Sequence, residues 1–254
     1  MEVTGEVNDE VVARLRAAGC VFAEEEAALL ADAADGSAAL AALVGRRVAG
    51  EPLEHVVGWA EFHGLRLHVA PGVFVPRRRT EFLADQAASL ARPGAVVVDL
   101  CCGCGALGAA VAAAVPVELH AADVSPAAVR VARRNVERVY LGDLFAALPD
   151  ALRGRVEVLV ANVPYVPTGE IDLMPPEARE HEPRGALDGG SDGLDVLRRV
   201  AARAPAWLAP GGHLLVEAAD RQVPTAVSVM AAAGLAARVV TAPDGEATVV
   251  IGTA

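Results

Sequence analysis

The spacing of hydrophobic residues divides the chain into two regions. In the first, apolar residues recur every three or four positions, as between Val11 and Ala18, and Gly19 ends this run. Such spacing places apolar side chains on one face of a helix. The pattern returns over residues 24–34 and 37–48, so we predict three short helices that form a small helical lobe. Such a lobe serves either packing or the recognition of a partner.

Between the two regions, hydrophobic and polar residues alternate over residues 59–75, with Gly64 at a turn. This pattern is typical of a β-hairpin. Residues 76–81, Pro-Arg-Arg-Arg-Thr-Glu, then begin a helix near Thr80 or Glu81. Three adjacent arginines most often form a solvated patch. At a helix N-terminus beside a crevice, they can instead bind an acidic ligand or order the lobe.

From residue 95 onward, short apolar runs alternate with helical patterns. We predict seven strands, at residues 95–100, 117–123, 138–141, 156–161, 212–218, 236–241 and 247–252. We predict helices at residues 106–115, 125–136, 192–208 and 222–233. Alternating strands and helices are typical of a doubly wound parallel sheet with right-handed crossovers. The long polar segment over residues 166–191 has no predicted element, and loops of that length are usually functional.

The last two predicted strands are joined by residues 242–246 alone, too few for a crossover helix. They should therefore form an antiparallel hairpin at the edge of the sheet. The predicted fold class is α/β, a doubly wound, seven-stranded, mostly parallel sheet with a C-terminal antiparallel hairpin and a small N-terminal helical lobe. We expect the lobe over residues 1–57, the hairpin connector over 58–75 and the sheet domain over 76–254.

Composition and charge restrict the partners. The chain has 254 residues, 54% of them hydrophobic, which is enough for one large domain with a small additional lobe. Its formal net charge of −11 argues against non-specific binding to nucleic acid or to an anionic membrane. The first ten residues lack the features of a signal peptide, and no apolar run reaches the ~18 residues of a membrane helix. We expect a cytoplasmic protein that binds neither membrane nor nucleic acid.

Three of the four cysteines lie within four residues, at Cys101, Cys102 and Cys104, whereas Cys20 stands alone. Three cysteines so close together cannot form a disulfide framework. A zinc site would need a second pair of Cys or His ligands at suitable spacing, which the sequence does not offer. We expect no metal, and we interpret the cluster as small apolar thiols in a tight loop.

A glycine-containing turn and two carboxylates follow successive predicted strands. The turn, Asp-Leu-Cys-Cys-Gly-Cys-Gly over residues 99–105, lets the backbone approach a ligand beside a helix N-terminus. Asp123 can accept hydrogen bonds from both ribose hydroxyls, and Asp143 can contact an adenine amino group. Each carboxylate could instead have a purely structural role: Asp123 could cap the next helix, and Asp143 could form a turn. The three features in order favour an adenosine-type cofactor.

The fourth strand of the sheet ends in Asn162, followed by Val163, Pro164 and Tyr165. Ligands bind beyond the carboxyl ends of such strands. The side-chain oxygen of Asn162 and the carbonyl of Val163 can accept the two hydrogens of a planar –NH2 group, and the ring of Tyr165 can face its nitrogen. Pro164 keeps the preceding residue extended. Asn-X-Pro-Tyr alone is a weak signal, which gains weight from the rest of the chain.

From about Arg46 to the C-terminus, the sequence resembles class I S-adenosylmethionine-dependent methyltransferases, and among them the HemK-type protein N(5)-glutamine methyltransferases, which modify peptide-chain release factors. The resemblance rests on residues 49–53, 58–62, 75–81, 99–105, 162–165 and 182–194. The last of these segments, Glu-Pro-Arg-Gly-Ala-Leu-Asp-Gly-Gly-Ser-Asp-Gly-Leu, is the most family-specific. Other amino-methylating enzymes share the Asn-Pro-Pro-Tyr-type motif but not this segment.

The resemblance implies a role for each matching residue. The residues implied to bind S-adenosyl-L-methionine are Cys101, Cys102, Gly103, Cys104 and Gly105 in the loop, Asp123 at the ribose, Asp143 and Leu144 at the adenine, and Asn162. The residues implied to bind the glutamine and act in catalysis are Asn162, Val163, Pro164 and Tyr165. The resemblance also makes residues 76–254 the S-adenosylmethionine-dependent methyltransferase domain, and it implies that the lobe reads the protein substrate.

The chain departs from the family pattern at four of these positions. Val163 replaces a proline but keeps the backbone carbonyl. Cys101 replaces a glycine. Arg78 and Arg79 replace the usual proline and acidic residue. The N-terminal lobe is also shorter than the family usually carries.

The function implied by the resemblance is methyl transfer from S-adenosyl-L-methionine to the side-chain amide nitrogen of a glutamine in a protein substrate, a release factor or another glutamine-containing protein. One alternative is an N6-adenine nucleic-acid methyltransferase, which grips an exocyclic –NH2 in the same way. Another is a non-catalytic ligand-binding or scaffold protein that kept the fold. A small-molecule methyltransferase also remains open, because a fold does not determine a substrate.

Overall fold

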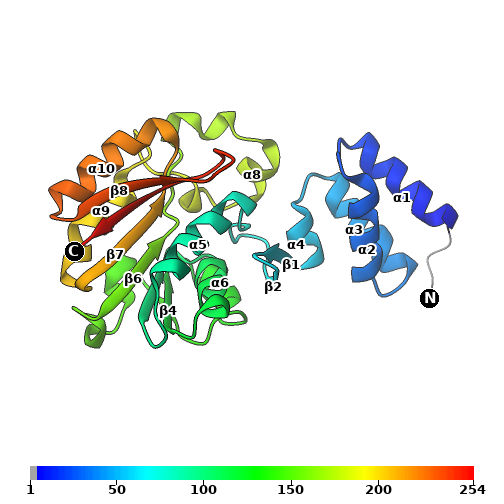
Figure 1. The fold of residues 1–254 in the computed structure, drawn as a ribbon. Coiled ribbons are helices and arrows are strands. Elements are labelled where there is room, and N and C mark those ends of the chain that lie inside the picture. Colours follow the sequence, from blue (N-terminus) through cyan, green and yellow to red (C-terminus); the bar gives the residue numbers. More distant parts are fainter. Residues whose placement is uncertain (1–4) are drawn as a thin grey trace.

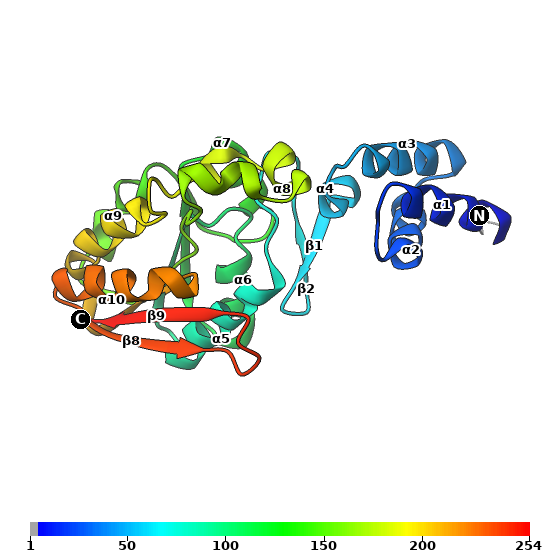
Figure 2. The same cartoon turned by 90° about the horizontal axis from the view of Figure 1, so that it is seen from above.

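The computed structural model of the protein describes residues 5–254. Its N-terminal helices are α1 (Gly5–Ala17), α2 (Ala23–Ala33), α3 (Ser37–Val48) and α4 (Leu53–Val57). They enclose a small core of their own, in which Leu15, Leu30 and Val44 are completely buried. Figures 1 and 2 show this group of helices at one end of the molecule, beside the larger sheet. The three helices predicted from the apolar spacing are confirmed.

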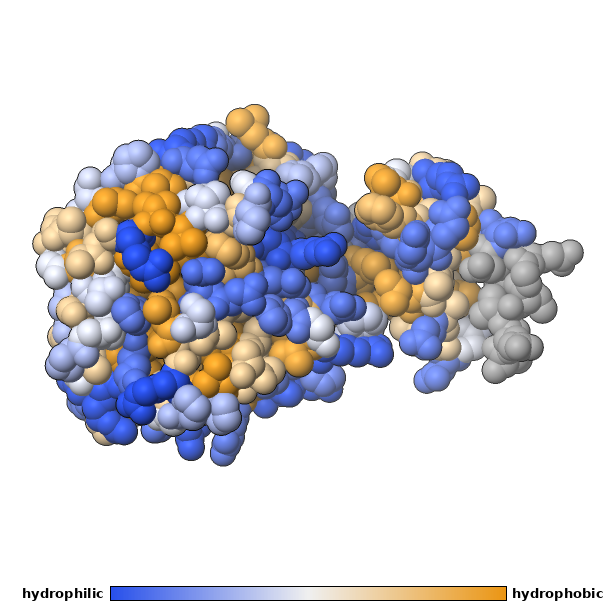
Figure 3. Space-filling model, viewed as in Figure 1, coloured by the Kyte–Doolittle hydropathy of each residue, from blue (hydrophilic) through white to orange (hydrophobic). Residues whose placement is uncertain are grey.

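An arginine connects the helical group to the rest of the protein. Arg47, at the end of α3, donates from Nε to Glu26 of α2 at 2.6 Å and from Nη1 to Glu177 of α8 (Pro176–His181) at 3.2 Å. The side chains of Arg47 and Glu26 are only 12% and 10% exposed. In Figure 3 the molecule is narrower where the two parts meet, and hydrophilic side chains lie on both sides of this neck.

The predicted hairpin is present but shorter than expected. Strands β1 (Trp59–Phe62) and β2 (Leu65–His68) pair antiparallel, and residues 69–77 have no regular structure before the 3-10 helix η1 (Arg78–Thr80) and α5 (Glu81–Leu90). Pro71 and Pro76 lack the N–H that a continued strand would need. The predicted extension of the hairpin to residue 75 is therefore wrong.

Seven strands form the main sheet: β3 (Val96–Leu100), β4 (Glu118–Asp123), β5 (Val139–Leu141), β6 (Val156–Ala161), β7 (Leu208–Glu217), β8 (Ala236–Thr241) and β9 (Thr248–Thr253). Their order is β5-β4-β3-β6-β7-β9-β8, and all pairs are parallel except the two that involve β9. The predicted fold class and the antiparallel C-terminal hairpin at the sheet edge are confirmed. The fold is that of class I methyltransferases.

Helices cover both faces of this sheet (Figure 1). They are α6 (Ala106–Ala114), α7 (Pro126–Ala132), α9 (Asp195–Arg203) and α10 (Val223–Ala232), together with α5. Val97 and Val158 of the sheet pack with α5 and α6, whereas their neighbours Val98 and Leu159 pack with α9 and α10. Successive side chains of a strand point to opposite faces of the sheet. Because both faces are buried here, the strands appear in the sequence as continuous apolar runs.

Three predicted boundaries and one predicted loop differ from the structure. Strand β7, expected over residues 212–218, begins at Leu208. The helix expected over residues 192–208 spans only α9 and continues into the 3-10 helix η6 (Ala204–Ala206), because Pro205 cannot donate a backbone hydrogen bond. Helix α7 ends at Ala132, not near Val136. The segment over residues 166–191 contains η4 (Thr168–Leu173), α8 and η5 (Arg184–Ala186). The remaining short helices are η2 (Leu144–Ala147), η3 (Asp150–Leu152) and η7 (Asp220–Gln222).

The part of the chain that the structure describes contains no helix with the length and apolar character required to span a membrane.

The burial of Arg47 predicts that two ion pairs of the helical group stabilise the protein to different extents. Arg47→Met would leave the buried Glu26 carboxylate without its cation, so we expect the free energy of unfolding to fall by about 3 kcal/mol in urea titrations. Arg16→Met removes an exposed pair with Glu24 and should leave the titration midpoint unchanged. Equal losses in the two variants would contradict this assignment.

Candidate active site

A cavity of about 420 Å³ lies beyond the carboxyl ends of β3, β4, β5 and β6. Every residue that the sequence predicts for the site lines it, with the exception of Gly105. These residues are Cys101, Cys102, Gly103, Cys104, Asp123, Asp143, Leu144, Asn162, Val163, Pro164 and Tyr165. Residues from the long stretch 101–165 thus line one space, which has the size of a small-molecule site.

Asp123 stabilises the turn after β3. One of its carboxylate oxygens accepts from the Gly103 N–H at 2.9 Å and the other accepts from the Ser125 N–H at 2.8 Å. The cap of α7 is Ser125, whose hydroxyl accepts from the Ala128 N–H, so the reading of Asp123 as the cap of that helix is wrong. Burial raises the pKa of Asp123. Each oxygen keeps a lone pair that a ligand hydroxyl could use.

Three residues of this turn have a left-handed backbone: Cys101 with φ 56°, Gly103 with φ 56° and Gly105 with φ 83°. Cys101 adopts this conformation at a cost that glycine avoids. Gly105 does not line the cavity, and a Cβ there would lie 2.8 Å from a methyl group of Val136. Close packing against the segment after α7 therefore explains this glycine.

The three clustered thiols are held in their protonated form. Burial raises the pKa of Cys101 and of Cys102, and it raises the pKa of Cys104 to about 12. A protonated thiol is neither a nucleophile nor a metal ligand. Among residues 5–254, no group of three or more His, Cys, Asp or Glu side chains is arranged to hold a metal ion.

Asp143 carries an ion pair that the sequence did not indicate. Its carboxylate accepts from Arg199 of α9, which also lines the cavity. The next residue, Leu144, has φ 48°, another left-handed conformation in a side chain other than glycine. Strained backbone positions cluster at functional sites, and both Cys101 and Leu144 lie on this cavity.

The tetrapeptide after β6 contains an acceptor without a partner. Oδ1 of Asn162 is buried and accepts no hydrogen bond from the residues that the structure describes. Leaving a buried acceptor unpaired costs about 1–3 kcal/mol. Val163, beside it, is 3% exposed. A donor supplied by a ligand would remove this cost.

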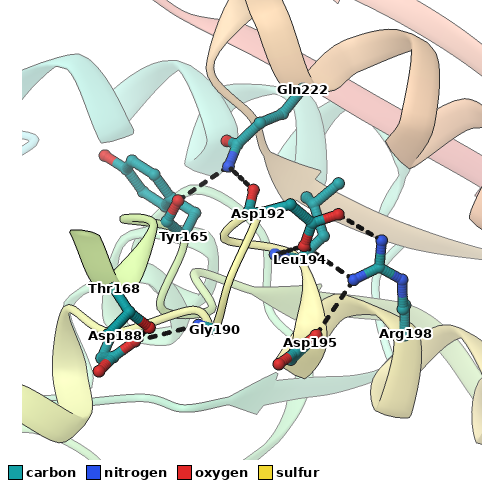
Figure 4. Close-up of polar contacts among 9 residues, drawn as sticks. All are labelled: Tyr165, Thr168, Asp188, Gly190, Asp192, Leu194, Asp195, Arg198 and Gln222. Atoms are coloured by element: carbon teal, nitrogen blue, oxygen red, sulfur yellow. Dashed lines mark hydrogen bonds and ion pairs between the residues drawn. The ribbon is translucent and has the colours of Figure 1, made fainter. Parts of the chain in front are cut away.

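The backbone of Tyr165 is fixed by a side chain that sequence reasoning missed. Gln222, in η7, donates from Nε2 to the carbonyl oxygens of Tyr165 and Asp192, both at 2.9 Å (Figure 4). Gln222 is 5% exposed. It therefore joins the tetrapeptide to the glycine-rich segment before α9. No spacing in the sequence could reveal it, because 57 residues separate Gln222 from Tyr165.

The glycine-rich segment packs directly against the tetrapeptide. A Cβ on Gly189 would lie 2.6 Å from the Pro164 carbonyl oxygen, and a Cβ on Gly193 would lie 2.1 Å from that of Tyr165. The N–H of Gly189 also donates to the carbonyl of Val166 at 2.9 Å. These contacts explain why a family-specific segment 20 residues away in sequence requires glycine.

Arg79 is one of the three arginines that we expected at a helix N-terminus beside a crevice, and it lines the cavity. Two further polar residues near it, Glu217 and Asp99, were not predicted. Arg79 and Glu217 contact the hydroxyl of Tyr165. Asp99 in β3 is completely buried, and its Oδ2 accepts from the Gly108 N–H at 2.9 Å. Burial raises the pKa of Asp99 to about 7. A carboxylate inside an apolar run was the only signal for Asp99, and the sequence offered none that joined Arg79 to Glu217.

Comparison with known proteins assigns the family. The profile described as the methyltransferase small domain matches residues 64–173. Over 204 residues the chain is 40% identical to the release factor glutamine methyltransferase of Geobacter sulfurreducens, a match that covers 78% of this chain and 71% of the relative. The chain belongs to the release factor glutamine methyltransferase family. It is therefore a methyltransferase, as the resemblance of its motifs implied.

Two other similarities bear on substrate and fold. The chain is 39% identical over 203 residues to a 4-amino-L-phenylalanine/4-methylamino-L-phenylalanine methyltransferase of Streptomyces pristinaespiralis, covering 75% of this chain and 69% of the relative. A crystal structure of a methyltransferase from Pyrococcus furiosus superimposes with a TM-score of 0.57 at 18% identity, covering 75% of this chain and 89% of that one. The second similarity shows the fold alone.

The packing under the tetrapeptide predicts the effect of one added methyl group. Gly193→Ala would place a Cβ against the Tyr165 carbonyl at φ 79°, so we expect the free energy of unfolding to fall by about 3 kcal/mol or more. Gly169→Ala adds the same methyl group where no atom lies within 4 Å, and it should cost less than about 1 kcal/mol. Urea titration of both variants measures the difference, and similar costs would refute the packing argument.

The buried carboxylate of Asp99 predicts a pH dependence of stability. In the unfolded chain it ionises near pH 4, whereas the folded protein holds its proton up to about pH 7. The stability that the protonated Asp99 contributes is therefore fully present below pH 4 and is lost as the pH rises to 7. Between pH 5 and pH 8, we expect the unfolding free energy of the wild type to fall by roughly 3 kcal/mol relative to Asp99→Asn, which cannot ionise. If urea titrations gave the same change in unfolding free energy between the two pH values for both proteins, the assignment to Asp99 would be wrong.

Proposed function

We propose that this methyltransferase transfers a methyl group from S-adenosyl-L-methionine to the side-chain amide nitrogen of a glutamine in a peptide-chain release factor. The observation that carries the proposal is Asn162, which lines the cavity and whose buried Oδ1 has no hydrogen-bond partner in the described chain. A planar –NH2 group of the substrate would satisfy this acceptor and the neighbouring carbonyl of Val163 together.

The turn after β3 and the carboxylates beside it suit S-adenosyl-L-methionine. Asp123 retains lone pairs for two ribose hydroxyls after its two backbone hydrogen bonds. Asp143 and Leu144 line the adenine side, where Arg199 already neutralises the Asp143 carboxylate. When bound, S-adenosyl-L-methionine supplies an electrophilic methyl group.

The residues of the chain would act on the acceptor nitrogen by orientation. An amide lone pair is delocalised and a poor nucleophile. Asn162 and Val163 would hold both N–H groups and so direct the lone pair to one side, and the ring of Tyr165 would face the nitrogen as positive charge develops on it. A positioned pair of reactants gains several kcal/mol over free ones. As the new C–N bond forms, the methyl–sulfur bond of the donor would break and release S-adenosylhomocysteine. The methylated nitrogen would then carry a strongly acidic proton that is lost to water, so no strong general base is required.

The choice of a protein substrate follows from the family. The relative from Geobacter sulfurreducens is named for a release factor glutamine, and this chain carries a helical lobe beside the cavity domain that could read a protein. We propose residues 1–57 as that lobe, 58–75 as a connector and 76–254 as the methyltransferase domain. The relative named for 4-amino-L-phenylalanine makes an aromatic amine a second candidate acceptor, since it also presents a planar –NH2 group.

Asn162→Ala tests the assignment. With labelled S-adenosyl-L-methionine and purified release factor, we expect the variant to lose at least about 100-fold in kcat, because one of two orienting acceptors is gone. Gln86→Ala truncates another side-chain amide, on α5 and outside the cavity, and should retain normal turnover. Circular dichroism and urea titration would verify that both variants are folded.

Mapping of the labelled side chain identifies the substrate. A label on glutamine supports the proposal. Turnover with 4-amino-L-phenylalanine but not with release factor would replace it with the second candidate, and full turnover by Asn162→Ala would refute the role of this residue.

A further inference from the structure

The hydroxyl of Tyr165 forms a hydrogen-bond network with two residues outside the tetrapeptide, Arg79 and Glu217. Arg79, in η1, donates from Nη2 to the Tyr165 hydroxyl and from Nε to Oε1 of Glu217 at 3.1 Å. The Tyr165 hydroxyl in turn donates to the same Oε1 at 3.3 Å. Glu217 is the last residue of β7. Three segments that are distant in sequence thus meet at one phenol.

Burial explains why this network stays together. The side chain of Glu217 is 6% exposed, and a carboxylate removed from water requires a cation or several donors. Within the described chain, Arg79 is the only cation at ion-pair distance from it. The planar guanidinium has separate N–H groups for the carboxylate and the phenol, which a lysine could not supply in the same geometry. Burial also raises the pKa of the Tyr165 phenol, so the hydroxyl remains a donor.

The same tyrosine is fixed at its other end. Gln222 donates to the Tyr165 carbonyl (Figure 4). Gly193 packs against the same carbonyl, so the backbone has no room to shift. The remaining freedom of Tyr165 is rotation about its two side-chain torsions. Two hydrogen bonds at the hydroxyl remove that freedom and set the angle of the ring at the cavity.

We propose that Arg79, with Glu217 as its counter-ion, is a positioning residue that acts through the hydroxyl of Tyr165 and fixes the ring against the acceptor nitrogen. The inference rests on the proposed function. It differs from direct substrate binding by Arg79, which its 48% exposed side chain would also permit. In direct binding, Arg79 would act whether or not Tyr165 had a hydroxyl.

A double-mutant cycle separates these two roles. We expect Arg79→Gln and Tyr165→Phe each to lower kcat about tenfold with little change in the KM for S-adenosyl-L-methionine, and the double variant to be no slower than the slower single variant. The proposal would be overturned if the loss of kcat in the double variant equalled the product of the two single losses. It would also be overturned if the variants raised only the KM for the acceptor. Arg78→Gln removes the same charge one residue away. The Arg78 side chain lies outside the cavity and makes no hydrogen bond within the described chain, so this variant should keep normal kcat.

A second measurement needs no turnover, so it separates a failure of this inference from a failure of the proposed function. The chain has only two tyrosines, and the 13Cζ resonance of each reports hydrogen bonding at its hydroxyl. The signal absent from Tyr165→Phe belongs to Tyr165. Arg79→Gln should move this signal, whereas Arg78→Gln should not, and the Tyr140 signal should stay fixed in both. An unmoved Tyr165 signal in Arg79→Gln would refute the contact.

Discussion

The register of three parallel strands is the constraint on which the active site depends. Leu100 of β3 lies beside Ala122 of β4 and Ala161 of β6, so these strands reach the same level at their carboxyl ends. The residues that follow, Cys101, Asp123 and Asn162, therefore begin at one edge of the sheet. A shift by one residue in any strand would turn its side chains to the opposite face and separate the cofactor-side carboxylate from the acceptor-side amide.

Close backbone contact is the second source of order. The segment after β6 lies so near the glycine-rich segment that side chains at Gly189 and Gly193 would overlap carbonyl oxygens. Gln222 then satisfies two of the carbonyls in this contact. The tetrapeptide is thus held by its main chain at Pro164 and Tyr165.

The polar groups in and beside the cavity differ in the partners that they have. Asp123 accepts from two backbone N–H groups, Asp143 pairs with Arg199, and Glu217 pairs with Arg79 through one oxygen. Oδ1 of Asn162 and Oε2 of Glu217 have no partner in the described chain. Among the described residues that line the cavity, Asn162 is the only one with an unpaired buried amide oxygen, and this acceptor suits a neutral, planar –NH2 group. This difference in pairing connects the electrostatics of the cavity to the proposed acceptor.

The sequence by itself determined the order of strands and helices, the antiparallel end of the sheet and most of the cavity, because apolar periodicity and residues at strand ends are local signals. The motifs at Asp123 and Asn162 were visible for the same reason. Helix α9 and the hairpin were predicted too long because the prolines that follow them interrupt the backbone hydrogen bonds. The short helices within residues 166–191 had no periodicity to reveal them. Only the tertiary structure decided that Arg79 and Glu217 meet at Tyr165, that Gln222 bonds to its carbonyl and that Gly105 serves packing. Those contacts join residues 52 to 138 positions apart, or depend on the exact approach of two backbones, and no local pattern encodes such distances.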